Sequence, residues 1–230
     1  MRTPRCAVWC LLMNVLEELL PPPVAAAEVF GDPPGLWLYP EEEACVARAV
    51  GRRRAEFTTG RHCARVALTR LGLEPAPIAK GERGAPRWPD GVVGSITHCR
   101  GYRAAAVART ADLVTIGIDA EPNEPLPDGV FGPISLPGER ARVAALAVSV
   151  PGVCWDRLLF SAKESVYKAW FPLTRAWLDF DGADISFDPA TATFAACLAD
   201  RGLTVAGQQR RELTGRFGVR DNILVTAVVC

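Results

Sequence analysis

Lysine is rare in this chain, and its placement indicates where a cation could do chemistry. Only three of the 26 basic residues are lysines, and two of them, Lys163 and Lys168, lie within residues 160–170, while Lys80 lies in a glycine-rich segment. A lysine carries a compact, flexible charge, whereas arginine presents a planar fork. The retained lysines therefore predict places that need an ammonium group. Chance clustering is the alternative, and Glu164 with Lys168 is also an ordinary i,i+4 helix pair.

Two carboxylates alternate along a strand that we expect at residues 113–121. Apolar residues at positions 116, 118 and 120 should face the core, which puts Asp119 and Glu121 on the opposite face, with open space beside Gly117. Carboxylates at this spacing repel each other unless protons or a cation intervene, and oxygen ligands suit a hard ion such as magnesium. The alternative is a strand end with two solvated acids.

Residues 155–170 predict a long helix with one apolar stripe, and Glu164 and Lys168 fall roughly opposite that stripe. Such a face would normally meet solvent, but Phe160 and Tyr167 flank it. We therefore expect a partly buried pocket wall. Together with the two strand carboxylates, this acid and lysine would suit a magnesium-bound pyrophosphate.

Several basic and hydroxyl side chains could supply the phosphate-binding side of such a site. The candidates are Arg52, Arg53, Arg54, Arg61, Lys80, Arg83 and residues 95–98, which include Thr97 and His98. A hydroxyl and an imidazole at a strand end can donate to an anion. A lone histidine is also often a packed structural residue, and an arginine run that closes a helix is often a solvated cap.

The composition predicts an ordinary globular protein of one large domain or two lobes. The 230 residues are 49% hydrophobic and 23% charged, with zero formal net charge and a pI near 6.7. This charge balance gives no reason to expect nucleic acid or a membrane surface as partner, so any anion site must be local. No segment reaches the roughly 20 apolar residues of a membrane helix.

The cysteines and the N-terminus bear on the compartment. Eight cysteines show no C-x-x-C pair, and with only two histidines they make no zinc pattern, so we expect reduced thiols and a cytoplasmic protein. Residues 2–16 resemble a signal peptide, but Glu17 and Glu18 interrupt the apolar run. Translation from Met13 would remove that resemblance and leave a short amphipathic helix to residue 20.

The remaining elements predict an α+β fold. Helices are expected at residues 41–54, 59–71, 137–148 and 155–170, and strands at 24–30, 92–98, 103–109, 113–121, 183–187, 193–198 and 223–229. The strands from 92 to 121 should form an antiparallel meander. Proline-rich residues 122–137 are expected to be a linker or flap.

Taken together, these residues resemble the 4'-phosphopantetheinyl transferases of the monomeric surfactin and enterobactin type. The resemblance spans about residues 24–230 and is specific because of the order and spacing of its motifs. The motifs lie at residues 57–61 (Phe-Thr-Thr-Gly-Arg), 84–89 (Gly-Ala-Pro-Arg-Trp-Pro), 94–98 (Gly-Ser-Ile-Thr-His), 117–121 (Gly-Ile-Asp-Ala-Glu) and 155–169.

This resemblance implies a fold and a reaction. The fold is two similar lobes related by a pseudo-twofold, each with a small antiparallel sheet packed on helices. We expect an N-terminal extension at 1–23, a first lobe at 24–121 and a second lobe at 122–230. The reaction is transfer of the phosphopantetheine arm of coenzyme A to a serine of a carrier protein, with release of adenosine 3',5'-bisphosphate.

The resemblance also implies roles for particular residues. Magnesium would be held by Asp119, Glu121 and Glu164, with the backbone carbonyl of Ala120 close by. Glu164, directly or through a water, would be the base for the carrier serine, and Lys168 would hold the pyrophosphate. The nucleotide and its phosphates would be bound by Arg53, Arg61, Lys80, Arg83, Thr97 and His98.

The implied partners are acyl or peptidyl carrier proteins of fatty-acid, polyketide or nonribosomal peptide synthases, as in siderophore or polyketide biosynthesis, and the protein is expected to be a monomer. Two alternatives remain. A different magnesium-dependent nucleotide or pyrophosphate transferase would share the acids, although the P-loop pattern G-x-x-x-x-G-K-[ST] is absent. A non-catalytic scaffold for coenzyme A or carrier proteins would not require Asp119, Glu121, Glu164 and Lys168 together.

Overall fold

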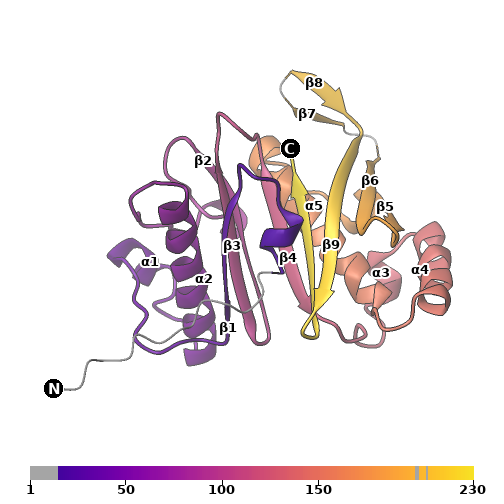
Figure 1. Ribbon diagram of the computed structural model, residues 1–230, viewed down its shortest axis with the longest axis horizontal. Coiled ribbons are helices and arrows are strands. Elements are labelled where there is room, and N and C mark those ends of the chain that lie inside the picture. The colour runs from indigo at the N-terminus through magenta and orange to yellow at the C-terminus, as the bar shows by residue number, and fades with distance from the viewer. Residues whose placement is uncertain (1–14, 200–201, 206) are drawn as a thin grey trace.

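Two antiparallel sheets stand side by side in the computed structural model, which describes residues 15–199, 202–205 and 207–230 (Figure 1). The first sheet has the order β1-β3-β2, from β1 (Ala25–Phe30), β3 (Tyr102–Arg109) and β2 (Val92–Cys99). The second has the order β4-β10-β9-β6-β5, from β4 (Ile116–Pro122), β10 (Ile223–Val229), β9 (Glu212–Arg220), β6 (Thr193–Leu198) and β5 (Ala183–Asp188). A hairpin of β7 (Leu203–Val205) and β8 (Gln208–Arg210) projects beyond the second sheet.

Each sheet packs against one long helix. These helices are α2 (Gly51–Arg70) on the first sheet and α5 (Trp155–Thr174) on the second. The shorter elements are η1 (Glu17–Leu19), α1 (Pro40–Ala44), η2 (Glu82–Gly84), α3 (Phe131–Ile134), α4 (Pro137–Ser149) and η3 (Phe180–Gly182). The predicted α+β class with two lobes, each a small antiparallel sheet packed on helices, is confirmed. Within the described residues, no helix is both long and apolar enough to cross a bilayer.

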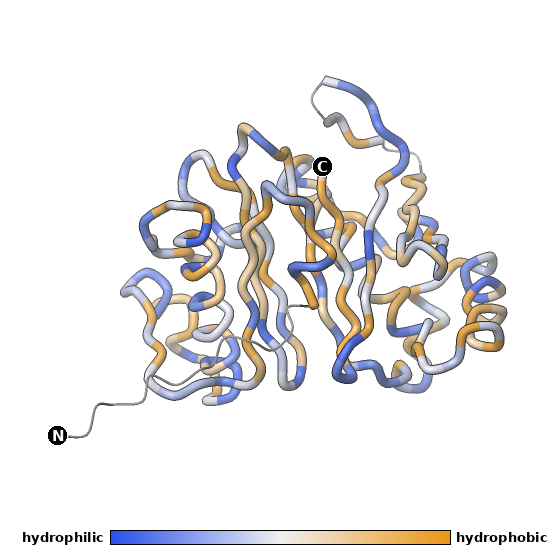
Figure 2. The backbone as a smooth tube through the Cα atoms, in the orientation of Figure 1, coloured by the Kyte–Doolittle hydropathy of each residue, from blue (hydrophilic) through white to orange (hydrophobic). Residues whose placement is uncertain are grey.

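The core has three parts because each central strand buries both of its faces. In β3, Ala105 and Val107 pack under α2, whereas Ala104 and Ala106 face a middle core that the two sheets share. The middle core also receives alternate residues of β4 and β10, and it is covered by Leu19 of η1 and by Val15 and Leu16 just before η1. Figure 2 shows this apolar material along the strands. The two lobes are therefore held together by the middle core, to which β3, β4 and β10 each contribute one buried face.

Hydroxyl groups join the two sheets at the edge where β2 meets β4. The Ser95 Oγ accepts a hydrogen bond from the Ile118 N–H at 3.1 Å, and the Thr97 Oγ1 accepts one from the Ala120 N–H at 3.0 Å. The backbone of β4 pairs instead with β10. The predicted meander of residues 92–121 is therefore wrong in its third strand, because side-chain hydroxyls replace a backbone ladder on that edge.

Two further expectations differ from the structure. The helix predicted at residues 41–54 is only the single turn α1, and the arginines at 52–54 open α2 instead of closing a helix. The buried Glu42 carboxylate explains the short turn, since it accepts hydrogen bonds from the Tyr39 and Ile78 N–H groups and from Arg65. Strand β9 was not predicted, because Gly215 takes an inward position that apolar periodicity would fill; a Cβ there would lie 2.1 Å from the Phe194 ring.

The other predicted helices and strands are present, with ends that differ by a few residues, except that α2 begins at Gly51 and not at the predicted residue 59. The helix predicted at 59–71 corresponds to α2, and α4 and α5 correspond to the helices predicted at 137–148 and 155–170. Met13 and all but the last two residues of the signal-like segment lie outside the described residues, and those two, Val15 and Leu16, are buried. The lobe boundary at residue 121 stays a prediction, although β4 lies in the same sheet as strands of the second half of the chain.

Candidate active site

A glycine lets α5 lie directly on β4. A Cβ at Gly117 would be 1.9 Å from the Ser165 carbonyl oxygen and 2.6 Å from the Ala169 nitrogen. The space beside Gly117, expected to be open, is therefore filled by helix backbone. This close approach brings Lys168 onto the side chain of Asp119 and places Glu164 close enough for their charges to interact.

Asp119 is oriented by two donors and keeps one oxygen without a partner. Its Oδ1 accepts hydrogen bonds from the Lys168 Nζ at 2.6 Å and from the Thr97 Oγ1 at 3.2 Å. Its Oδ2 is buried and has no hydrogen-bond partner in the described structure. Lys168 also donates to the Ile118 carbonyl at 3.1 Å. A buried, unpaired carboxylate oxygen is costly, so it marks a place where a ligand or ion is expected.

The two neighbouring acids have raised pKa values. Burial, followed by the negative charge of Asp119, raises the pKa of Glu121 to about 7, even though Arg157 pairs with it at 3.1 Å. Burial likewise raises the pKa of Glu164, with Lys168 opposing that shift and Asp119 adding to it. These acids are thus held in a low-dielectric region where another cation would be favourable.

The described residues contain no cluster of three histidine, cysteine or carboxylate side chains close enough to hold a metal ion as they stand. The donors nevertheless fit magnesium in type, because all are oxygens and Asp119 has an unpaired buried oxygen. The ammonium of Lys168 occupies the other Asp119 oxygen, and Arg157 occupies Glu121. The metal role of Asp119, Ala120, Glu121 and Glu164 therefore stays a prediction.

A cavity of about 780 Å³ lies beside this acidic group, between the end of β2, α2, α5 and the loop around η2. Of the predicted site residues, the cavity is lined by Arg53, Arg61, Lys80, Arg83, His98, Glu164 and Lys168. Thr97, Asp119, Ala120 and Glu121 are not among its lining residues. Most of the predicted phosphate-binding residues therefore line the cavity. Thr97 instead lies behind the cavity wall and orients Asp119.

The first-lobe wall of the cavity is basic and aromatic. The guanidinium of Arg61 lies 4.0 Å from the centroid of the Phe57 ring and donates to the Ile78 carbonyl at 2.6 Å. The Lys80 Nζ lies 5.1 Å from the same ring. Burial lowers the pKa of Arg61 to about 10. Burial also lowers the pKa of Lys80, and the nearby positive charge of Arg53 lowers it further. No carboxylate of the described residues forms an ion pair with either cation, so both are available to an anionic ligand.

A smaller cavity of about 280 Å³ adjoins the large one and shares Arg83, Glu164 and Tyr167 with it. Arg83 has a positive φ of 51°, and its guanidinium lies 5.1 Å from the centroid of the Trp177 ring. The side chain of Lys163 also lines this smaller cavity. It is buried, however, and already bonded to Glu139 at 2.9 Å and to the carbonyls of residues 180 and 183. The contacts of Lys163 are therefore structural.

Three residues of the site were missed by sequence reasoning. Glu56 and Arg175 line the large cavity, and Arg157 pairs with Glu121. Glu56 lies four residues before the predicted Gly60-Arg61 motif, one helical turn away, so helical spacing could have indicated it. Arg175 follows the last residue of α5 and has a positive φ of 54°. No local sequence pattern predicts that its side chain lines the cavity.

A cavity lined by cations lies beside buried Asp119 and half-buried Glu121 and Glu164, an arrangement suited to an anionic ligand next to a polar reaction centre. Residues 41–108 match the model of the 4'-phosphopantetheinyl transferase N-terminal domain, and residues 115–215 match that of the 4'-phosphopantetheinyl transferase superfamily. The chain belongs to the 4'-phosphopantetheinyl transferase superfamily, and it is an enzyme that transfers phosphopantetheine from coenzyme A to carrier proteins.

Three curated 4'-phosphopantetheinyl transferases are similar to this protein over most of the chain. It is 54% identical over 217 residues to 4'-phosphopantetheinyl transferase Svp of Streptomyces mobaraensis, covering 93% of this chain and 88% of the relative. It is 48% identical over 227 residues to 4'-phosphopantetheinyl transferase PptT of Mycobacterium tuberculosis, covering 96% and 99%. It is 46% identical over 222 residues to 4'-phosphopantetheinyl transferase Npt of Nocardia iowensis, covering 93% and 99%.

Proposed function

We propose that transfer takes place where the large cavity meets Asp119, with coenzyme A in the cavity and the carrier serine entering beside Glu164. The observation that carries this proposal is the unpaired, buried Oδ2 of Asp119 next to Lys168, at the edge of a cavity lined by cations. Arg61 and Lys80, for which the described residues provide no carboxylate partner, are suited to phosphate oxygens.

The reaction requires one proton transfer and one displacement at phosphorus. The serine hydroxyl attacks the phosphorus that carries the pantetheine arm, a new P–O bond forms, and the pyrophosphate P–O bond breaks to release adenosine 3',5'-bisphosphate. Glu164 accepts the serine proton, directly or through a water, since it lines the cavity and accepts no hydrogen bond from any described residue. Lys168 stabilises the charge on the pyrophosphate, because its ammonium lines the same cavity.

Asp119, Glu121 and Glu164, with the Ala120 carbonyl, are the residues that would hold magnesium. Their oxygens are the ligand type that this ion prefers. When bound, magnesium would neutralise charge on the pyrophosphate. Thr97 serves the site by orienting Asp119 through its 3.2 Å hydrogen bond.

The nucleotide part of coenzyme A occupies the first-lobe wall. Arg53, Arg61, Lys80, Arg83 and His98 all line that wall and are proposed to bind the nucleotide and its phosphates. The two lobes are proposed to be residues 24–121 and 122–230, with an extension at 1–23.

The partners are proposed to be acyl or peptidyl carrier proteins of fatty-acid, polyketide or nonribosomal peptide synthases. The protein is proposed to act as a cytoplasmic monomer. In keeping with a reducing compartment, the six cysteines in the described residues are free thiols.

Calorimetric titration with coenzyme A tests the site directly. We expect magnesium to tighten binding in the wild-type protein, and Asp119→Asn to abolish that gain while leaving magnesium-free binding within about threefold. Glu124→Gln is the matched control, since Glu124 pairs with Arg100 away from the cavity. Equal affinity with and without magnesium in the wild type would contradict the metal assignment.

A further inference from the structure

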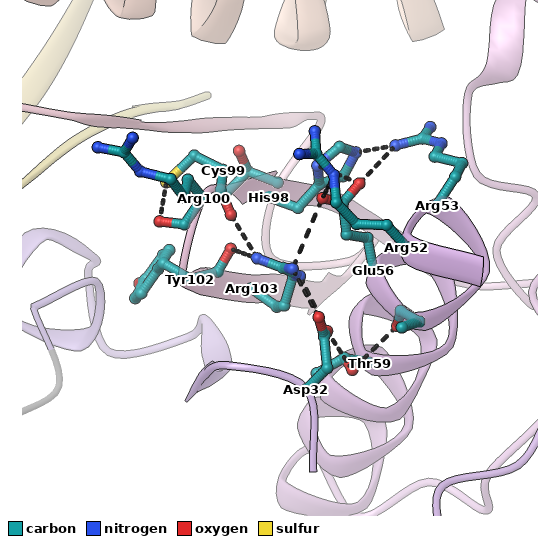
Figure 3. Close-up of polar contacts among 12 residues, drawn as sticks. Asp32, Arg52, Arg53, Glu56, Thr59, His98, Cys99, Arg100, Tyr102 and Arg103 are labelled. Atoms are coloured by element: carbon teal, nitrogen blue, oxygen red, sulfur yellow. Dashed lines mark hydrogen bonds and ion pairs between the residues drawn. The ribbon is translucent and has the colours of Figure 1, made fainter. Parts of the chain in front are cut away.

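Glu56 is a nearly buried carboxylate in the cavity wall, and no step proposed above uses it. It lies on the second turn of α2 with 9% of its surface exposed. Four basic groups surround its two oxygens (Figure 3). The Oε1 lies 3.4 Å from the Arg52 Nε and 3.7 Å from the Arg103 Nη2, and the Oε2 lies 3.7 Å from the Arg53 Nη1 and 3.9 Å from the His98 Nδ1.

One of these cations is fixed by the fold. Arg103 donates to both oxygens of Asp32, at 3.1 and 2.8 Å, and to the carbonyls of residues 99 and 102. Asp32 also accepts a hydrogen bond from the Thr59 Oγ1 at 2.8 Å, on the same helix as Glu56. Figure 3 shows this chain of contacts running from Thr59 through Asp32 to Arg103. Glu56 therefore sits between an immobile guanidinium and the groups that line the cavity.

Two residues that line the cavity, Arg53 and His98, lie on the cavity side of Glu56. The Arg53 Nη1 donates to the His98 Nε2 at 2.5 Å, which requires the histidine proton to be on Nδ1, the nitrogen that faces Glu56. The carboxylate favours that tautomer and offsets the repulsion between the guanidiniums of Arg53 and Arg103. Without the Glu56 carboxylate, the positive charges of Arg52, Arg53 and Arg103 would repel one another.

We propose that Glu56 is a positioning residue that orients His98, and with it Arg53, so that the Arg53 guanidinium is held on the cavity wall for a phosphate of coenzyme A. This inference rests on the proposed binding of coenzyme A in that cavity. Simple electrostatics and positioning predict opposite changes in the affinity for coenzyme A when Glu56 loses its charge. Removing a negative charge near a phosphate site should tighten anion binding, whereas losing the residue that holds the Arg53 guanidinium in place should weaken it.

Steady-state transfer kinetics with coenzyme A varied, at saturating carrier protein and magnesium, provide the test. Activity of the wild-type protein comes first, since its absence would defeat the proposed function and not this inference. For Glu56→Gln we expect the KM for coenzyme A to rise about tenfold, with kcat within about twofold. In an Arg53→Ala background the same substitution should add no further rise, because Glu56 acts through Arg53.

Glu43→Gln is the matched control. Glu43 pairs with the neighbouring arginine, Arg54, at 2.5 Å, but neither residue lines the cavity. Its KM should equal that of the wild type. A KM that is unchanged or lowered in folded Glu56→Gln, or losses that add fully with Arg53→Ala, would overturn the inference.

A second readout separates positioning from general loss of structure. Imidazole nitrogen chemical shifts in the protein without coenzyme A should show His98 protonated on Nδ1 in the wild type, and a mixture of tautomers in Glu56→Gln. His62→Gln assigns the signals, since the chain has two histidines. If Glu56→Gln does not fold, Glu56→Asp keeps the charge but withdraws it by one methylene, and it must raise the KM in the same direction. An unaltered KM in Glu56→Asp would equally overturn the inference.

Discussion

Lys168 on α5 donates to Asp119 on β4 across 2.6 Å, and this contact joins the long helix of the second lobe to the strand at the lobe junction. The two residues are 49 positions apart in sequence. Within the described part of the chain, no hydrogen bond reaches the second oxygen of Asp119. Catalysis is thus proposed to depend on a lysine that can serve either this carboxylate or a phosphate.

The helix must lie close to the strand for this contact to exist, so Gly117→Ala should be strongly destabilising. A Cβ would lie 1.9 Å from the Ser165 carbonyl, and we expect a loss of at least about 3 kcal/mol in the free energy of unfolding. Chemical denaturation measures this. Gly132→Ala is the control, because its Cβ would meet nothing within 4 Å and should change stability by less than about 1 kcal/mol. Equal stabilities of the two variants would contradict the packing argument.

Lys163 should matter for stability and not for chemistry. It forms a buried ion pair with Glu139 at 2.9 Å, and Glu139 also accepts hydrogen bonds from the Leu136 and Ile185 N–H groups. Lys163→Met leaves that carboxylate buried without its cation, so we expect a loss of about 3–5 kcal/mol in urea unfolding. Arg220→Met, which breaks a more exposed pair with Glu18, should cost no more than about 1 kcal/mol. A small effect of Lys163→Met would show that the pair is dispensable.

His98 should stay neutral through the physiological pH range. Burial, and then the nearby charge of Arg53, lowers its pKa to about 4 from the usual 6.5. Between these two values the unfolded chain binds a proton that the folded protein does not, so stability falls as the pH drops from about 6.5 toward 4. His98→Asn should lose less stability over that interval, as measured by urea unfolding at several pH values. A proton NMR titration of His98 with a midpoint near 6.5 would disprove the shift.

Much of the site followed from residue types and helical spacing, whereas contacts between lobes did not. Apolar periodicity predicted α5 and the buried faces of β4, because those patterns depend only on local geometry. It could not show that Thr97 points behind the cavity wall, because that depends on which strand lies beside β4. Nor could it show that Glu56 gathers several basic groups, because that depends on how α2 packs against β2 and β3. The arginine run at 52–54 was placed at the wrong end of a helix because Glu42 is drawn into the fold by Arg65 and Ile78, which are distant in sequence.

Glu164 is the residue on which the proposed chemistry depends most. Glu164→Gln keeps the size of the side chain but cannot accept a proton from the carrier serine, so we expect kcat to fall about 100-fold or more. Coenzyme A binding should persist in this variant, because the cations of the first-lobe wall are untouched. Calorimetric titration with coenzyme A checks the binding, and loss of both binding and activity would indicate that Glu164 is needed to form the site.

The most direct measurement is the intact mass of a purified apo carrier protein after incubation with this protein, coenzyme A and magnesium, beside a sample with a chelator. We predict the mass gain of one phosphopantetheine, which the chelator suppresses and Glu164→Gln loses. No mass gain on acyl and peptidyl carriers alike, with coenzyme A still bound tightly, would contradict the account and favour a non-catalytic scaffold.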